Sequence, residues 1–205
     1  MSRRKALIYG MPLLAIAYVV ALLGLAQPGG AFITIARWIG NSSEWASGFT
    51  AGVASPPFPA TTLANVQTAG ARWSNPSTGK NFTFFDYTNL AGPTRIWVDK
   101  RSFAAQGWPG DPGITFITRF TTGANAGRLQ FANVYLNSDW TWNTTCTLNQ
   151  AGKQADVLTI ILHEMGHAVS LDHDPAFPNA VMWPNYVCKQ NLTADDKNGI
   201  AALYP

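Results

Sequence analysis

All three histidines of the chain lie in the short segment ILHEMGHAVSLDHD, residues 161–174, and a glutamate stands beside the first of them. His163 and His167 are four residues apart, and residues at this spacing share one face of a helix, with Cβ atoms about 5–6 Å apart. They can therefore bind one metal ion. Glu164 would lie about a quarter turn from His163, where it can act on a water molecule at that metal without being a ligand. If the chain then turns back, His173 supplies a third ligand, and three protein ligands with one open position are typical of catalytic zinc.

The same histidines could instead be unrelated surface or core residues that bind no metal. The pattern H-E-x-x-H alone arises by chance in a chain of this size with a probability on the order of 0.5%, given average residue usage. A third histidine at the required spacing lowers that probability about fiftyfold. Metal binding is therefore the preferred interpretation.

Periodicity and composition predict the elements that position this cluster. The cluster itself lies in a segment of helical character, residues 154–171, and an earlier helix over 60–75 has Thr61 or Thr62 as its N-cap. Residues 192–205 are predicted to form a terminal helix that begins after Thr193. Four runs rich in β-branched and aromatic residues predict strands at 81–88, 94–100, 113–120 and 128–136. Helices and strands in this order predict an α+β domain.

Length and composition restrict the class of protein. A chain of 205 residues with 47% hydrophobic and 12% charged residues is long enough for one domain with a sizeable core. The formal charge of +3 is matched by Arg3, Arg4 and Lys5, so the remainder is close to neutral. No basic stripe is left for a nucleic acid, and we expect none as a partner. The many aromatic residues are expected to fill the core, although Trp140 and Trp142 could instead line a substrate groove.

The N-terminal segment has the features of a targeting sequence. The basic residues of MSRRK precede an uncharged apolar stretch, residues 6–26, which we interpret as a secretory signal peptide or as an uncleaved membrane anchor. We prefer cleavage, because breaks at Gly10 and Pro12 shorten the apolar run. Residues 27–59 are poorly determined, although 32–39 could form a strand, and the main domain is expected over 60–205.

Either destination of the N-terminal segment places the remaining chain outside the cell. In that oxidising environment we expect Cys146 and Cys188 to form a disulfide, and the alternative is two buried free thiols. The localisation expected is secreted or extracellular, or anchored to the outer face of the membrane by residues 6–26.

Several stretches resemble a known family of proteins. HEMGHAVSLDH, residues 163–173, resembles the zinc signature of the metzincin metalloproteases, and NAVMWPNY, residues 179–186, is similar to their Met-turn. Within that clan, DVLTIILHEMGHA before the site and LTADDKNGIAALYP at the C-terminus are most similar to the matrixins. The resemblance is specific over about 128–205 and extends only to strand order over 60–127.

The resemblance implies a fold and a role for individual residues. The fold would be the metzincin fold, an α+β structure whose twisted, mostly parallel sheet has an antiparallel edge strand, with a zinc helix, a Met-turn and a C-terminal helix. The implied zinc ligands are His163, His167 and His173, with Glu164 as catalytic base. The other implied site residues are Met182 in the Met-turn, the S1′ wall of Pro184, Asn185 and Tyr186, and a substrate-binding edge strand that includes Ile114, Thr115, Phe116, Ile117 and Thr118.

The sequence departs from the matrixin pattern in three respects. Ser170 stands where the zinc signature has glycine, and a positive φ there would cost serine roughly 1 kcal/mol. No stretch resembles the matrixin pro-domain with its cysteine switch. No histidine remains for a second zinc site, so we expect one catalytic Zn²⁺. Calcium remains possible without an assigned site, because Asp111, Asp139 and Asp156 are widely dispersed.

The function implied is that of a zinc metalloendopeptidase, a hydrolase of the EC 3.4.24 type acting on peptide bonds of extracellular proteins. A zinc-activated water would attack the scissile carbonyl, with Glu164 as general base. Pro184 stands where astacin-like relatives have a zinc-reaching tyrosine, which leaves oxyanion stabilisation mainly to zinc. The alternatives are a zinc hydrolase of short peptides or other amides, and a secreted adhesion protein with a structural zinc. We expect protein or peptide substrates, a monomer, and membrane contact only through an uncleaved anchor.

Overall fold

The computed structural model describes residues 49–53, 60–74, 82–85, 96–124, 126–127 and 129–203. The predicted targeting segment, residues 1–26, and the possible strand at 32–39 lie outside these ranges. Within the described part of the chain, no helix combines the length and the apolar character needed to cross a membrane.

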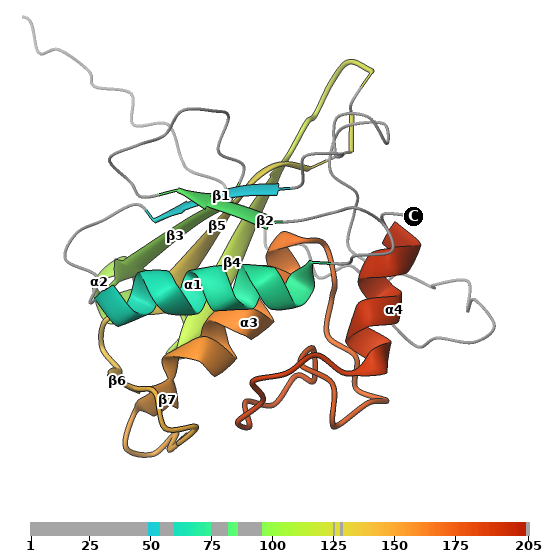
Figure 1. The fold of residues 1–205 in the computed structure, drawn as a ribbon. Coiled ribbons are helices and arrows are strands. Elements are labelled where there is room, and N and C mark those ends of the chain that lie inside the picture. Colours follow the sequence, from blue (N-terminus) through green and yellow to red (C-terminus); the bar gives the residue numbers. More distant parts are fainter. Residues whose placement is uncertain are drawn as a thin grey trace, which may run out of the picture.

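A mixed five-stranded sheet forms the framework, with strand order β2-β1-β3-β5-β4 (Figure 1). The strands are β1 (Phe49–Val53), β2 (Phe82–Phe85), β3 (Ile96–Arg101), β4 (Gly113–Arg119) and β5 (Leu129–Asn137). Every neighbouring pair is parallel except β4 with β5, which is antiparallel, and β4 is the last strand on its side. The four predicted strands are thus present as β2 to β5, in a sheet with the expected antiparallel edge.

Strand β1 was not predicted. It comes from the segment 27–59, and its residues FTAGV contain an alanine and a glycine, which have low strand propensity. Pairing with β2 and with β3 on its two sides nevertheless places it inside the sheet. The sheet therefore includes residues that precede residue 60, the expected start of the main domain.

Helices α1 (Ala60–Trp73) and α3 (Val157–Ala168) lie together on one side of the sheet (Figure 1). Trp73, at the end of α1, is fully buried, and its indole Nε1 donates a hydrogen bond to the carbonyl oxygen of Leu162 at 2.8 Å. Helix α3 is buried on almost every side, and only His167 among its residues is partly exposed. A helix that is buried on almost every side belongs to the core. This one also contains His163, Glu164 and His167.

The start of α3 corrects the predicted helix over 154–171. Residues Gln154–Asp156 form a short strand, β7, which pairs in parallel with β6 (Thr141–Asn143). The helix begins only at Val157, because Asp156 is its N-cap and accepts a hydrogen bond from the backbone N–H of Thr159 at 2.8 Å. It ends at Ala168 rather than at residue 171. The acceptor side chain before the apolar run marks the boundary that periodicity alone placed too early.

Two further helices complete the described fold. The short α2 (Phe103–Gln106), which was not predicted, begins after the N-cap Ser102 and ends at Gly107, whose φ of 67° is left-handed. The predicted terminal helix is α4 (Ala194–Leu203). Thr193 is its cap, as expected: its backbone N–H donates to Asp196 Oδ2 at 2.8 Å, while its hydroxyl oxygen accepts from the Asp196 N–H at 3.4 Å.

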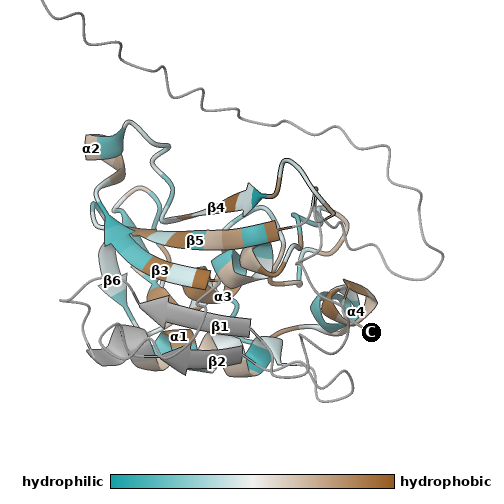
Figure 2. Ribbon diagram, turned by 90° about the horizontal axis from the view of Figure 1, so that it is seen from above, coloured by the Kyte–Doolittle hydropathy of each residue, from teal (hydrophilic) through white to brown (hydrophobic). Residues whose placement is uncertain are grey.

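The core lies between the sheet and the pair of helices α1 and α3. Figure 2 shows hydrophobic residues along β5 and at the beginning of β3, and hydrophilic residues where β3 leads toward α2. The colours follow the burial of β3, in which Ile96 and Val98 are fully buried and Arg101 is exposed. The buried core thus extends from β3 and β5 to α3, the helix that carries His163 and His167.

Candidate metal centre and active site

The histidines are brought together by α3 and by a sharp turn at its end. His163 and His167 are one helical turn apart on α3, and the helix then stops at Ala168. Ser170 has φ of 83°, the left-handed conformation, and its N–H donates to the His167 carbonyl oxygen at 2.8 Å. This turn sends the chain back so that His173 reaches the other two. The positive φ that the zinc-signature glycine suggested is present, although the residue is a serine.

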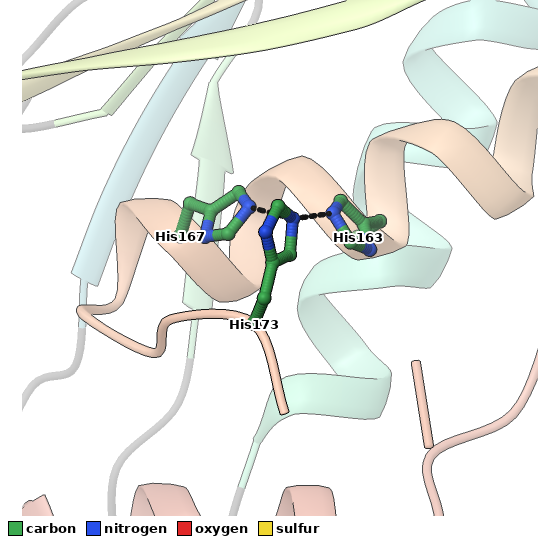
Figure 3. Close-up of side chains that lie close together, drawn as sticks. All are labelled: His163, His167 and His173. Atoms are coloured by element: carbon green, nitrogen blue, oxygen red, sulfur yellow. Dashed lines mark hydrogen bonds between the residues drawn. The ribbon is translucent and has the colours of Figure 1, made fainter. Parts of the chain in front are cut away.

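The three imidazole rings converge on one point (Figure 3). Nε2 of His173 lies 3.1 Å from Nε2 of His163 and 3.2 Å from Nε2 of His167. Two nitrogens that bind one tetrahedral zinc at about 2.0–2.1 Å lie roughly 3.4 Å apart, so the observed spacing is close to that of a ligand set. Among the described residues, this is the one group of three or more potential metal-binding side chains.

The hydrogen bonds of two of the rings leave their converging nitrogens free of protons. Nδ1 of His163 lies 2.7 Å from the carbonyl oxygen of Val181, and Nδ1 of His167 lies 2.8 Å from that of Leu171. A carbonyl oxygen only accepts, so both Nδ1 atoms carry the proton and both Nε2 atoms present a lone pair. Burial lowers the pKa of His163 well below its usual value, and it also lowers the pKa values of His167 and His173. Two neutral rings whose Nε2 lone pairs face the third histidine suit a bound cation.

Glu164 is buried beside the cluster with only 2% of its surface exposed. One carboxylate oxygen, Oε2, accepts a hydrogen bond from the Thr115 hydroxyl at 2.7 Å, and the other, Oε1, accepts from the Tyr186 hydroxyl at 3.1 Å. Burial raises the pKa of Glu164 to about 7, although the two hydroxyl hydrogen bonds act in the opposite direction. A carboxyl group with a pKa near neutrality both accepts and releases a proton readily, as a general base that later acts as an acid requires.

A cleft of about 300 Å³ opens onto these groups. Its walls come from β4 and the residues before it, from α3, from Asp172 and His173, and from Tyr186. The predicted strand residues Ile114, Thr115 and Ile117 line it. Thr118 and Phe116 do not line it, and Phe116 packs against Trp108 with ring centroids 5.0 Å apart. The cleft therefore runs along β4, the last strand on this side of the described sheet.

The S1′ wall predicted from the resemblance is represented in the cleft by one of its three residues. Tyr186 lines the cleft, and its ring contacts that of His163 with centroids 5.2 Å apart. Pro184 and Asn185 are not among the lining residues. Desolvation by burial, and then the proximity of the Glu164 carboxyl, raise the pKa of the Tyr186 phenol above its usual value, so this hydroxyl stays protonated and can donate.

Met182 packs against α3 at Gly166, between the two histidines of that helix. Met182 is 3% exposed, and a Cβ atom added to Gly166 would collide with its Sδ and lie 2.8 Å from Cζ2 of Trp73. Glycine at 166 thus allows the methionine to approach α3. The backbone N–H groups of Val181 and Met182 donate to the buried carboxylate of Asp196, at 3.0 and 3.2 Å. Helix α4 therefore holds this segment in place.

The predicted disulfide between Cys146 and Cys188 is present, with Cα atoms 5.3 Å apart. A hydrogen-bonding centre lies beside it at the fully buried Asp156. Its carboxylate accepts from the Cys146 N–H at 3.1 Å and from the Gln190 amide at 3.2 Å, in addition to capping α3. The disulfide joins the loop of Cys146 to the loop of Cys188 and Gln190, and the Asp156 carboxylate ties both loops to the start of α3.

The dispersed aspartates considered for calcium serve separate hydrogen bonds. Asp139 accepts from the N–H of Ala104 at 2.9 Å, and Asp156 is the helix cap described above. The backbone oxygen of Asp111 accepts from the Asn137 side chain at 2.9 Å. Trp140, which could have lined a groove, is 7% exposed and donates its indole N–H to the Gly110 carbonyl oxygen at 3.0 Å. Its bonds, with those of Asn137, hold the residues that lead into β4.

Sequence reasoning missed the contacts that surround Glu164. Thr115 was noted only for its place on a strand, and nothing in the sequence signals that its hydroxyl meets a carboxylate 49 positions away. Gly113 was not singled out either. A Cβ atom there would lie 2.6 Å from Ile160 Cγ2 and 2.8 Å from Glu164 Cγ, so only glycine lets β4 approach α3 this closely. A glycine at the first position of an apolar strand was the available signal.

Three convergent imidazoles beside a buried carboxylate, in a cleft along a sheet edge, are the parts of a metal-dependent hydrolase. The family model for the matrixins matches residues 59–205, which is more than half of the chain, and the protein belongs to the matrixin family. Membership makes it a metallopeptidase with the metzincin fold and implies zinc as its metal.

Proposed function

We propose that the protein is a zinc-dependent endopeptidase that cleaves peptide bonds in extracellular proteins, with Glu164 as general base. The observation that carries this proposal is the buried Glu164 carboxylate beside the three-histidine group, in a cleft along β4, the strand that ends the described sheet. A purely structural zinc site would be closed by a fourth ligand and would have no use for this carboxylate.

His163, His167 and His173 would hold the metal through their Nε2 atoms. Bound zinc supplies a Lewis acid that polarises the scissile carbonyl and lowers the pKa of water toward 7. Glu164 accepts a proton from the attacking water at a carboxylate oxygen and transfers it to the leaving amine as the C–N bond breaks. The hydrogen bonds from the two Nδ1 atoms to Val181 and Leu171 keep the rings of His163 and His167 in the required orientation throughout.

The edge of β4 is the proposed binding site for the polypeptide. A substrate in extended conformation would pair with residues 114–118 as an added antiparallel strand, because β4 pairs with β5 on one side and ends the described sheet on the other. Tyr186, with Pro184 and Asn185 beside it in the chain, would form the wall of the pocket after the scissile bond. Main-chain pairing favours long polypeptides over isolated amides.

We also propose that the protein acts outside the cell, either free or anchored by residues 6–26. The Cys146–Cys188 disulfide supports this location, because such bonds persist mainly in oxidising compartments.

The test combines metal analysis with cleavage of an unfolded protein. The purified chain is expected to contain one zinc per molecule and to cleave casein, and a chelator should abolish the cleavage until zinc is restored. Glu164→Ala should retain zinc and lose roughly 10²–10⁴-fold in kcat, the range for loss of a general base. Cleavage restricted to dipeptides and tripeptides would contradict the endopeptidase assignment. Full activity in Glu164→Ala would contradict the role of the glutamate.

A further inference from the structure

A threonine of the edge strand makes the closest polar contact of the Glu164 side chain. Thr115 lies on β4, and its Oγ1 is 2.7 Å from Glu164 Oε2 and 3.0 Å from the main-chain oxygen of the same glutamate. Both contacts cross from the sheet edge to α3. The hydroxyl therefore lies between the carboxylate and the backbone of a single residue on the zinc-site helix.

This placement suits both protonation states of the glutamate. A hydroxyl has one proton to donate and two lone pairs that can accept. When Oε2 carries no proton, Thr115 donates to it. When Oε2 carries a proton, the Thr115 oxygen can accept a hydrogen bond from it and donate its own proton in a hydrogen bond to the main-chain oxygen 3.0 Å away. The carboxyl group keeps a partner in either state without rotating.

The remaining contacts leave the carboxyl group little freedom to move. Tyr186 donates to the opposite oxygen, Oε1, at 3.1 Å. Gly113 packs so closely that a Cβ atom there would lie 2.8 Å from Glu164 Cγ. The Glu164 side chain thus contacts β4 through its Cγ atom and through Oε2. Its other oxygen, Oε1, contacts Tyr186 in the loop after Met182.

We propose that Thr115 is a positioning residue of the peptidase reaction, which holds the Glu164 carboxyl group in one orientation while a proton arrives from water and leaves with the amine. This proposal rests on the proposed function of Glu164 as general base. Thr115 itself exchanges no proton with the substrate. The strand that pairs with the substrate therefore also orients the catalytic carboxylate, so substrate binding and general-base catalysis share one element.

The matched variants are Thr115→Val, which keeps the branched shape and removes the hydroxyl, and Thr115→Ser, which keeps the hydroxyl. Thr141→Val, at an exposed position on β6, is the control for a threonine-to-valine change outside the cleft. We expect Thr115→Val to lower kcat about 10–100-fold, the range for loss of a hydrogen bond to a charged group, with KM within about twofold of the parent. Thr115→Ser should recover most of kcat, and Thr141→Val should match the parent.

Two measurements separate positioning from a structural role and do not depend on activity. Zinc affinity of Thr115→Val should stay close to the parent value. Tm should fall by no more than about 10 °C, because the buried Glu164 carboxylate loses one hydrogen bond. Crystal structures of the zinc-loaded full-length proteins should show the Glu164 carboxylate rotated or spread over several conformers in Thr115→Val but not in Thr115→Ser.

The proposal is overturned if Thr115→Val keeps the parent kcat, if serine restores nothing, or if the lost activity follows lost zinc or unfolding at the assay temperature. An unchanged carboxylate position in the Thr115→Val crystal structure overturns it as well. If the parent itself cleaves no peptide, the proposed function fails, and the crystal structures still decide whether Thr115 orients Glu164.

Discussion

Replacing Ser170 with glycine should stabilise the protein, because this serine is unfavourable in two independent ways, through its backbone conformation and through its hydroxyl. Its φ of 83° is left-handed, a conformation that costs an L-residue about 1–2 kcal/mol. The side chain is fully buried, and its hydroxyl oxygen has no hydrogen-bond partner among the described residues. Such an unsatisfied group costs about 1–3 kcal/mol.

Two opposing effects reduce the gain from Ser170→Gly. Glycine loses about 0.5–1 kcal/mol more conformational freedom on folding than a residue with a side chain. Removing the buried Cβ also gives up packing worth about 0.8 kcal/mol per carbon. The central values give an increase of about 2 kcal/mol in the free energy of unfolding, or about 4–8 °C in Tm for a chain of this length.

The assay is thermal unfolding in the presence of chelator, because bound zinc would add its own contribution to the stability. Ser170→Ala separates the two causes, since it removes the hydroxyl and keeps the Cβ atom in the left-handed turn. Gly107→Ala provides the reverse change at a residue with φ of 67°, where an added Cβ atom would meet nothing within 4 Å, so it should lose about 1 kcal/mol. Equal stability of Ser170→Gly and Ser170→Ala would refute the cost assigned to the backbone. A Ser170→Gly protein no more stable than the parent would refute the reasoning as a whole.

Two other predictions concern the disulfide and the buried glutamate. Cys146→Ser/Cys188→Ser opens a loop of 42 residues, worth about 4 kcal/mol in the chain-entropy model, so Tm should fall by about 10 °C while zinc still binds. An unchanged Tm would mean that Asp156 alone holds these loops. In the zinc-free protein, burial raises the pKa of Glu164 from 4.5 to about 7, so between these values the folded state holds a proton that the unfolded state releases. The contribution of Glu164 to the free energy of unfolding therefore rises as pH falls from 8 to 5. Over that range the free energy of unfolding of the parent should rise, relative to that of Glu164→Gln, by at most about 3 kcal/mol. Denaturant unfolding of both proteins measures the difference. A constant difference between the two proteins would show that the pKa of Glu164 is not raised.

The parts of the fold that could be predicted are those that depend on residues close together in the sequence. The pair His163 and His167 falls on one helical face whatever surrounds it, and β-branched runs indicated β2 to β5. Strand β1 was not predicted, because FTAGV is short and contains residues of low strand propensity. Its place in the sheet depends on pairing with residues far along the chain. The end of α3 was misplaced because apolar residues continue past Ala168, whereas the backbone turns at Ser170.

The side-chain environment of the site was beyond sequence reasoning for a different reason. Asp156 and Asp196 look like surface carboxylates in the sequence, yet they are 0% and 1% exposed. Each is buried because several backbone N–H groups converge on it, and such convergence depends on the tertiary arrangement of loops. The contact of Thr115 with Glu164 likewise depends on which face of β4 turns toward α3.

The orientation of the first histidine shows how much of the site lies outside the H-E-x-x-H segment. The ring of His163 is fixed by its hydrogen bond to the Val181 carbonyl oxygen at 2.7 Å. The N–H of that same residue donates to Asp196, which also accepts from Met182 and from the cap residue of α4. A buried carboxylate that accepts several N–H hydrogen bonds holds those backbone groups firmly, because each of them would otherwise be left unsatisfied. Helix α4 therefore holds residues 181–182 in place, and through Val181 it sets which nitrogen of His163 faces His173.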